Sequence, residues 1–225
     1  MSVSMGKCAV QRQSCLHRKV IKMGKILFLG TENACYHPMK PMGEKIAWLF
    51  CEDEVEITGE TKALEYLEGQ KLCILYTEFG EPKLPDKQVQ ALADYVKKGG
   101  CALFLHNGIS LAVHEEVEEM TGGRFLMHPP YEELPLLEFS AKEETHPVIA
   151  GVSKFQIREE AYRYQLNTDP KREIFLQYED EAGKWPAGWR RTYGAGQVYC
   201  LAFGHQAECL ETEGVQRILQ NICRR

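Results

Sequence analysis

Long hydrophobic runs are missing from this 225-residue chain. None approaches the roughly 20 apolar residues that a membrane-spanning helix needs. No block of lysine and arginine argues for nucleic acid, and no polybasic or amphipathic segment argues for a membrane surface. The formal net charge of −5 is distributed over both signs along the chain. These absences predict a cytoplasmic protein with neither a nucleic-acid nor a membrane partner, and they are compatible with a homo-oligomer.

Several catalytic and cofactor motifs are also missing. No GxGxxG follows the first predicted strand and no GxxxxGK[ST] occurs, so the sequence offers no cradle for nucleotide phosphates. The HExxH motif of zinc hydrolases and the GxSxG elbow of serine hydrolases do not occur either. The nine cysteines are odd in number and include no CxxC pair. This argues against a disulfide framework or a structural zinc, and for a reducing compartment.

The overall composition is that of a globular protein. Hydrophobic residues make up 44% and charged residues 26%, which permits a sizeable core. Neither an internal repeat nor a linker divides residues 23–225, so we expect a single domain there. Residues 1–22 are basic, carry no acidic residue and lack the apolar centre of a secretory signal. An organelle presequence or translation assigned too early would fit them, and we expect a disordered extension.

Strands and helices alternate through the first half of the chain. Apolar runs at 25–30, 72–76 and 101–105 predict buried strands, and 55–58 alternates like a short strand. Helical spacing follows each of the first three strands, and the helix that begins at Asp86 stops at Gly99-Gly100. This succession of βαβ units predicts an α/β fold with three layers, in which a doubly wound, mostly parallel sheet lies between helices.

The pattern changes after residue 110. Residues 111–120 predict a helix, and 124–165 contain strand fragments broken by prolines, which we expect to fold across the sheet. Two final strands are predicted at 173–178 and 197–203, with a hairpin-like excursion between them. Residues 215–222 predict a closing amphipathic helix.

Two of the predicted strands end in the same way. Residues 103–105 lead into His106, and 201–203 lead into Gly204-His205. In a parallel sheet both exits lie at the carboxyl edge, where open α/β sheets bind ligands. Histidine transfers protons near neutral pH and also ligates metals. We therefore predict that His106 and His205 share a site; the alternative is two separate histidines, each bonded to backbone.

A carboxylate is the third component that we expect at this edge. Glu160 follows another acid, Glu159. It could orient an imidazole, act as a general base, or complete a divalent-metal site, such as a zinc site, with His106 and His205. The alternative for this acidic pair is a solvated face.

Other polar and aromatic residues are candidates for binding a substrate. Trp185 or Trp189 could stack on a sugar ring. His146 precedes a proline and is expected in a surface turn or at a helix start. The candidates for hydrogen bonds to substrate are Asn107, Tyr162, His128, Tyr131, Glu32 and His37.

Short sequence words, in a fixed order, resemble those of one known family. The chain is similar to the trehalose-utilisation, or ThuA-like, family from about residue 23 to its end. Gln206 follows His205 where the family usually has an acidic residue, and Glu208 is the nearest acid. The matching words are Leu105-His106-Asn107, His128-Pro129, His146-Pro147-Val148, Glu159-Glu160-Ala161-Tyr162, Tyr193-Gly194-Ala195-Gly196 and Gly204-His205.

The resemblance implies the fold of class I glutamine amidotransferases, a flavodoxin-like parallel sheet between helices. In those relatives a cysteine nucleophile stands on the elbow after the central strand. This chain has His106 there, which argues against glutaminase chemistry. The resemblance also implies a role in the use of trehalose and related disaccharides, in pathways that oxidise sugars to keto forms, and some members of the family resemble metal binders.

Three hypotheses for the function follow. The first is an enzyme that acts on a disaccharide or keto-sugar, in which His106 and His205 move protons and Glu160 orients or accepts them. The second is a non-catalytic sugar-binding or assembly module. The third is a hydrolase that depends on a metal held by the same three residues. The expected partner is a small-molecule sugar.

Overall fold

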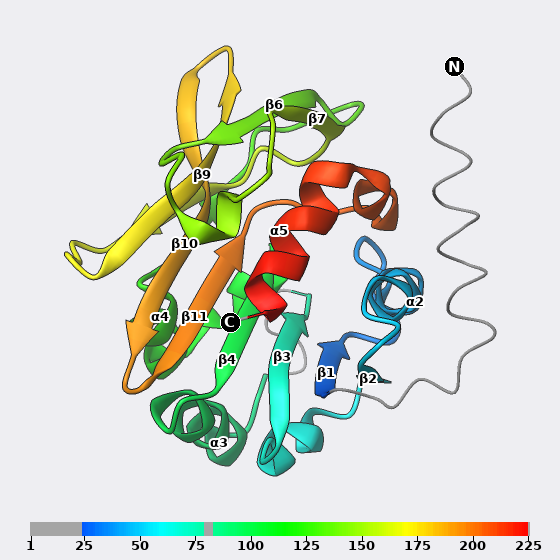
Figure 1. Ribbon diagram of the computed structural model, residues 1–225, viewed down its shortest axis with the longest axis vertical. Coiled ribbons are helices and arrows are strands. Elements are labelled where there is room, and N and C mark those ends of the chain that lie inside the picture. Colours follow the sequence, from blue (N-terminus) through cyan, green and yellow to red (C-terminus); the bar gives the residue numbers. More distant parts are fainter. Residues whose placement is uncertain (1–23, 79–82, 225) are drawn as a thin grey trace.

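The computed structural model describes residues 24–78 and 83–224 (Figure 1). The disordered extension predicted for residues 1–22 lies outside the described residues. Within the described part, no helix is both long and apolar enough to cross a membrane. Six cysteines in that part are free thiols, namely Cys35, Cys73, Cys101, Cys200, Cys209 and Cys223.

A sheet of nine strands forms the centre of the molecule, and five of its strands are parallel. Each of the five overlaps a strand that the sequence analysis predicted. The predicted α/β fold with a doubly wound sheet is therefore confirmed. In spatial order the five are β2 (Glu54–Thr58), β1 (Lys25–Gly30), β3 (Gln70–Tyr76), β4 (Cys101–Leu105) and β11 (Gly196–Leu201).

Four antiparallel strands extend the sheet beyond β11, and they correct two predictions. The excursion expected between the last two strands is itself a long strand. Of the four strands of the middle segment, two join this edge of the sheet instead of crossing its face. The other two, β5 (Gly123–Met127) and β8 (Arg163–Leu166), form a separate two-stranded sheet. The added strands are β10 (Gly183–Tyr193), β9 (Arg172–Asp180), β6 (Leu136–Ala141) and β7 (Phe155–Arg158).

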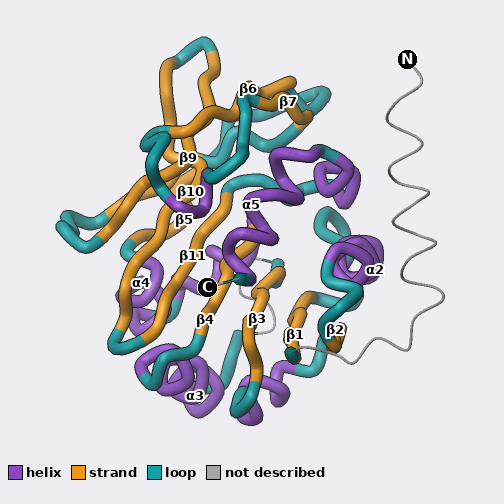
Figure 2. Tube along the Cα trace, in the orientation of Figure 1, coloured by secondary structure: helices purple, strands orange, loops and turns teal. Residues whose placement is uncertain are grey.

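Helices cover both faces of the sheet, which gives the three predicted layers (Figures 1 and 2). Helices α2 (Met39–Leu49) and α5 (Glu213–Cys223) bury their apolar sides on one face, and α3 (Asp86–Lys97) and α4 (Glu115–Thr121) bury theirs on the other. Strand β1 shows why the strands read as continuous apolar runs: Ile26 and Phe28 enter one core, and Leu27 and Leu29 enter the other.

Short 3₁₀ helices connect several of these elements. The helix predicted for residues 111–120 is in fact two pieces: a 3₁₀ helix, η2 (His106–Val113), and then α4, with a break at His114. The segment predicted to be helical after β2 is also a 3₁₀ helix, η1 (Thr61–Tyr66). The remaining two are η3 (Pro147–Ile149) and η4 (Ala207–Glu211).

The carboxyl ends of β1, β3, β4 and β11 meet at one edge of the sheet. Strands β4 and β11 are parallel neighbours, and Leu105 pairs with Leu201 at the carboxyl ends of the two strands. His106 and His205 are therefore delivered to the same edge. This confirms the geometry that the two strand endings predicted.

Candidate functional site

The site begins at a sharp elbow after β4. His106 has a φ of 47°, and it is the one non-glycine residue with positive φ in the described part of the chain. A non-glycine residue in this left-handed region is conformationally strained, and the surrounding packing has to compensate for that strain. The imidazole of His106 is completely buried and stacks on Tyr162, with 4.1 Å between the ring centroids. The fold thus fixes this ring tightly at the end of the central strand.

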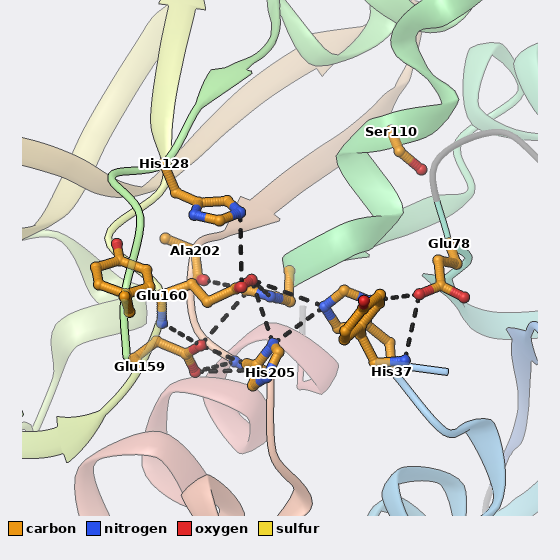
Figure 3. A network of polar contacts seen from close by, with 12 residues as sticks. His37, Glu78, Ser110, His128, Glu159, Glu160, Ala202 and His205 are labelled. Carbon is orange, nitrogen blue, oxygen red and sulfur yellow. Dashed lines mark hydrogen bonds and ion pairs between the residues drawn. The ribbon is translucent and has the colours of Figure 1, made fainter. Parts of the chain in front are cut away.

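Four side chains converge at this point (Figure 3). His37 comes from the loop after β1, His106 from the elbow, Glu160 from the segment between β7 and β8, and His205 from the loop after β11. One nitrogen or oxygen atom from each residue lies within 4.8 Å of the other three. We call these four residues the His₃Glu cluster.

The carboxylate of Glu160 lies at the centre of the His₃Glu cluster. Its Oε2 atom is 3.2 Å from His106 Nε2, 3.2 Å from His205 Nδ1 and 3.8 Å from His37 Nε2. Burial raises the pKa of Glu160, but its contacts with the three imidazoles outweigh that effect and hold the pKa well below its ordinary value. Glu160 is therefore a carboxylate anion at neutral pH, and not part of the solvated face that was the alternative interpretation.

The hydrogen bonds of His106 determine which of its nitrogens carries the proton. Nδ1 lies 2.6 Å from the carbonyl oxygen of Ala202, which can only accept, so Nδ1–H is the donor. Burial, partly opposed by the bond to Glu160, lowers the pKa of His106 to about 4, so the ring is neutral at pH 7. Its Nε2 lone pair then faces the Glu160 carboxylate. Two acceptors 3.2 Å apart need a proton or a cation between them.

His37 is oriented in a similar way. Its Nδ1 lies 3.5 Å from Oε1 of Glu78, a residue that follows β3, so Nε2 is directed toward the cluster. That atom lies 3.2 Å from His205 Nδ1. Imidazoles that ligate metals usually donate their second N–H to a carboxylate or a carbonyl oxygen. His106 does so to Ala202, and the second nitrogen of His37 lies near the carboxylate of Glu78.

His205 has the opposite charge preference from His106. Burial lowers its pKa, but the hydrogen bond and the negative charge of Glu160 outweigh burial and raise the pKa above its ordinary value. The ring is also less enclosed, since its side chain is 14% exposed. His205 is therefore the imidazole of the cluster that most readily carries a proton when no cation is bound.

Glu159 binds the backbone next to two residues of the cluster, Glu160 and His205. The sequence analysis gave it no role. It is fully buried, and its carboxylate accepts backbone N–H groups from Gly204 at 2.6 Å, Glu160 at 2.9 Å and His205 at 3.1 Å. Burial, opposed by these N–H donors, raises its pKa to about 7. A solvated-face interpretation is wrong for this residue as well, because it ties the loop that carries His205 to the segment that carries Glu160.

Three of the predicted substrate-binding residues lie beside the cluster. His128 is one-third exposed; its Nδ1 donates to the carbonyl of Pro129 at 2.8 Å, and its Nε2 lies 3.7 Å from Glu160 Oε1. Its ring stacks on Tyr131, with 5.5 Å between centroids, and more distantly on Tyr162, at 5.9 Å. The hydroxyl of Tyr131 accepts the N–H of Ala161 at 2.7 Å, which anchors the segment carrying Glu160.

Asn107, the residue after the elbow, is a further buried polar group. It is 1% exposed, and neither atom of its carboxamide has a hydrogen-bond partner among the described residues. Buried amides are nearly always paired, so an unpaired one beside a candidate site is a place for a ligand or a bound water.

Four other predicted residues lie outside the cluster. Glu32 is exposed, and its side chain lies over Gly59 at the end of β2. Trp189 is 1% exposed and donates its indole N–H to Thr121, so it belongs to the core. Trp185 faces the guanidinium of Arg163 at 3.7 Å and bonds to Asp180, so no sugar-stacking role is supported for either tryptophan. His146 starts η3, as predicted, but it is buried and not at the surface.

Two members of the site escaped the sequence analysis in part. His37 was expected to bind substrate and instead belongs to the His₃Glu cluster. Glu78 was not considered, although it stands two residues past the end of β3, where the rule for strand exits would have found it.

Fold and site together define a class: an α/β protein of flavodoxin-like topology whose central strand ends in a histidine elbow. The sequence model for trehalose utilisation, ThuA, matches residues 25–224, so the chain belongs to the ThuA family. No curated protein sequence matches the chain significantly.

Solved structures support this assignment at the level of the fold. A ThuA-like protein from Bacteroides uniformis has a TM-score of 0.70 at 17% identity, with 91% of each chain covered. One from Parabacteroides merdae has a TM-score of 0.72 at 13% identity and covers 89% of this chain and 88% of its own. A GMP synthase subunit from Thermoplasma acidophilum has a TM-score of 0.60 at 12% identity, covering 90% and 93%. The last likeness agrees with the amidotransferase-like fold that the sequence resemblance implied.

Proposed function

We propose that this chain is a carbohydrate-processing enzyme that acts on a disaccharide or keto-sugar and uses a divalent cation held by the His₃Glu cluster. The observation that carries the proposal is the convergence of three imidazole nitrogens on one carboxylate oxygen, with the Nε2 lone pair of His106 directed inward. Family membership supports the sugar as substrate, since the family is described by trehalose utilisation. The absence of a cysteine at the elbow argues against glutamine hydrolysis.

The donor set fits a cation of the zinc type. Three neutral imidazoles and one carboxylate suit first-row divalent metals such as zinc, whereas magnesium and calcium prefer oxygen ligands. Catalytic zinc sites use three protein ligands and keep a position for water or substrate, so the four residues of the cluster supply the donors that such a site needs. When bound, such a cation polarises a carbonyl group or lowers the pKa of a water molecule.

The surrounding residues supply binding and proton transfer. His128 is partly exposed, its Nδ1 proton is held by the Pro129 carbonyl, and its Nε2 is available to take a proton from a substrate and return it. The unpaired carboxamide of Asn107 offers both a donor and an acceptor to a sugar hydroxyl or carbonyl group. Tyr131 and Tyr162 fix the ring of His128 and that of His106 by stacking, which keeps both imidazoles in place during turnover.

The experiment measures metal and turnover on the same samples. Protein purified without chelator is analysed for bound metal, alone and after incubation with zinc, and is then assayed with trehalose and its keto derivative. Wild type is expected to bind one equivalent and to form product. His205→Ala and Glu160→Gln should lose the metal and the activity, while His114→Ala, an imidazole outside the cluster, should keep both.

Each failure has a distinct meaning. A wild-type protein that remains metal-free after zinc incubation would contradict the metal site. Metal and saturable sugar binding without product over long incubation would instead favour the non-catalytic sugar-binding module. Turnover that is unaffected by loss of the metal would favour the hypothesis that the histidines and Glu160 act by acid–base chemistry without a metal.

A further inference from the structure

A cavity of about 250 Å³, most of whose lining residues have polar side chains, lies at the carboxyl edge of the sheet and has no role in the site described above. Its walls come from residues just after β1 and β2 and from two residues after β3, Thr77 and Leu84. Apart from two glycines, the lining residues are Thr31, Glu32, Asn33, Thr61, Thr77 and Leu84. Glu32, which the sequence analysis assigned to substrate binding, is thus placed in this cavity and not in the His₃Glu cluster.

The position of the cavity is the one that open α/β sheets use for ligands. Strands β1 and β3 are neighbours in the sheet. After β1 the chain adds β2 toward one edge of the sheet, and after β3 it adds β4 toward the opposite edge. The order of the strands therefore reverses between β1 and β3. The crevice above such a reversal is where ligands bind in doubly wound folds.

One of the lining residues has a buried hydroxyl group without a partner. Thr77 is 6% exposed, and its Oγ1 makes no hydrogen bond with any residue of the described segments. The carbonyl of the same residue does have a partner, because it accepts the hydroxyl of Ser110 at 3.1 Å. A buried hydroxyl without a partner destabilises the folded state, so its presence points to a ligand group or water that completes it.

The chemistry of the lining selects a class of ligand. Three threonine hydroxyls, a carboxamide and a carboxylate can donate and accept hydrogen bonds in many directions. No lysine or arginine is among the lining residues, and Glu32 is negative, so a phosphate or carboxylate ligand would be repelled. A neutral molecule rich in hydroxyl groups fits this set.

The cavity is connected to the His₃Glu cluster through Glu78. The N–H of Glu78 donates to Thr31 Oγ1 at 3.1 Å, Thr77 precedes it in the chain, and its carboxylate faces His37. Between a molecule that contacts Thr31 and Thr77 and the imidazole cluster there would therefore be one residue, Glu78.

We propose that this cavity is a second sugar subsite, which binds one hydroxyl-bearing ring of a disaccharide while the other ring reaches the His₃Glu cluster. The inference rests on the proposed function for the position of the reacting ring. The hydroxyl of Thr77 donates to or accepts from a hydroxyl of the distal ring, and Glu32 and Asn33 contact the same ring from the open side.

The experiment compares the affinities of wild type and three variants for trehalose and for glucose, by calorimetry on the metal-loaded protein. Thr77→Val keeps the shape of the side chain and removes its hydroxyl, Thr77→Ser keeps the hydroxyl, and Thr145→Val changes an exposed threonine outside the cavity. Thr77→Val should bind trehalose about 3–10-fold more weakly, as expected for one neutral hydrogen bond, with unchanged glucose affinity. Thr77→Ser and Thr145→Val should behave as wild type.

Two results would overturn the subsite. One is equal trehalose affinity in Thr77→Val and wild type; the other is an equal loss for trehalose and glucose, which would place the hydroxyl at the reacting ring. Metal content is measured on every sample. A full complement of metal with no effect of Thr77→Val contradicts the subsite alone. A metal-free wild type contradicts the proposed metal site, and the trehalose and glucose affinities of the metal-free proteins then decide the subsite by the same criteria.

Discussion

At the scale of single residues, the site depends on polar contacts that orient the imidazole rings. The carbonyl of Ala202 holds the Nδ1 proton of His106, and the carboxylate of Glu78 faces Nδ1 of His37. Each ring then directs Nε2 inward. Glu159 positions the backbone of the site, since its carboxylate accepts hydrogen bonds from the N–H groups of Glu160 and His205.

The first prediction concerns Glu159 as a positioning residue. Glu159→Gln replaces one carboxylate oxygen with an NH₂ group, so that a donor faces at least one of the backbone N–H groups. We expect zinc affinity to fall by about 10–100-fold, as for other residues that orient metal ligands. The measurement is a zinc titration together with the absorption spectrum of the cobalt-substituted protein, which reports ligand geometry and is insensitive to a uniform loss of stability.

Glu138→Gln is the matched control for this variant. Glu138 is an exposed glutamate paired with Lys154 at 3.1 Å, and such pairs contribute little to stability. Its zinc affinity and cobalt spectrum should be those of wild type. A cobalt spectrum unchanged in Glu159→Gln would show that Glu159 does not orient the cluster.

The site residues differ in how far the sequence could predict them. His106, His205 and Glu160 were predicted to share a site, because two of them follow apolar strands and parallel strands exit at one edge. His37 was expected at the same edge and assigned to substrate binding. Its place among the other two histidines depends on the path of the loop after β1, which is not encoded in local periodicity. The role of Glu159 depends on which way an adjacent side chain turns, which an acidic pair in a sequence does not reveal.

At the scale of elements, η2 makes a close contact with β3 just after the elbow. A Cβ atom on Gly108 would lie 2.1 Å from the carbonyl oxygen of Leu75, a distance that real side chains do not adopt. The absence of a side chain at this position lets η2 pack against the strand and keeps His106 in its strained conformation.

The second prediction follows from that contact. Gly108→Ala should push η2 away from β3, lower the free energy of unfolding by about 1–3 kcal/mol and reduce metal binding, because His106 moves with the elbow. Chemical denaturation and metal analysis check the two effects. Gly69→Ala is the comparison: it places a Cβ at a φ of +78° with no atom within 4 Å, so it should cost stability and leave metal binding intact. Full metal occupancy in Gly108→Ala would argue against the link between η2 packing and the site.

The elements themselves were predicted well where strands and helices alternate locally. The antiparallel edge was not, for a physical reason visible in β10. Pro186 and Gly188 interrupt its pattern, and its pairing with β9 shifts register on both sides of Gly188. Proline and glycine favour turns, so this stretch was predicted to be an excursion, whereas pairing with both β9 and β11 holds it in the sheet.

At the scale of the whole molecule, the four residues of the His₃Glu cluster come from four distant segments of the chain. A cation bound to them would join loops that follow β1, β4 and β11 to the segment between β7 and β8. Because the unfolded chain has no such preformed site, binding stabilises the folded state by mass action.

The third prediction is therefore a thermal one. Removing zinc with a chelator should lower the melting temperature by about 5–10 °C, if free zinc is near 100 times its Kd before removal and each kcal/mol is worth a few degrees at this chain length. Differential scanning calorimetry measures the shift, and readdition of zinc should restore it. Glu160→Gln serves as the control, since chelator should leave its melting temperature unchanged. Equal shifts in both proteins would mean that the metal binds elsewhere.

The wide separation of the site residues also bears on the order of events during folding. His37 and His205, whose facing ring nitrogens lie 3.2 Å apart, are separated by 168 positions in the chain. Contacts between such distant segments form late, because closing a long loop costs entropy before any contact compensates it. The chain would thus complete its sheet first and acquire its cation afterwards, so the ion would act as the last step of maturation and not as a nucleus for folding.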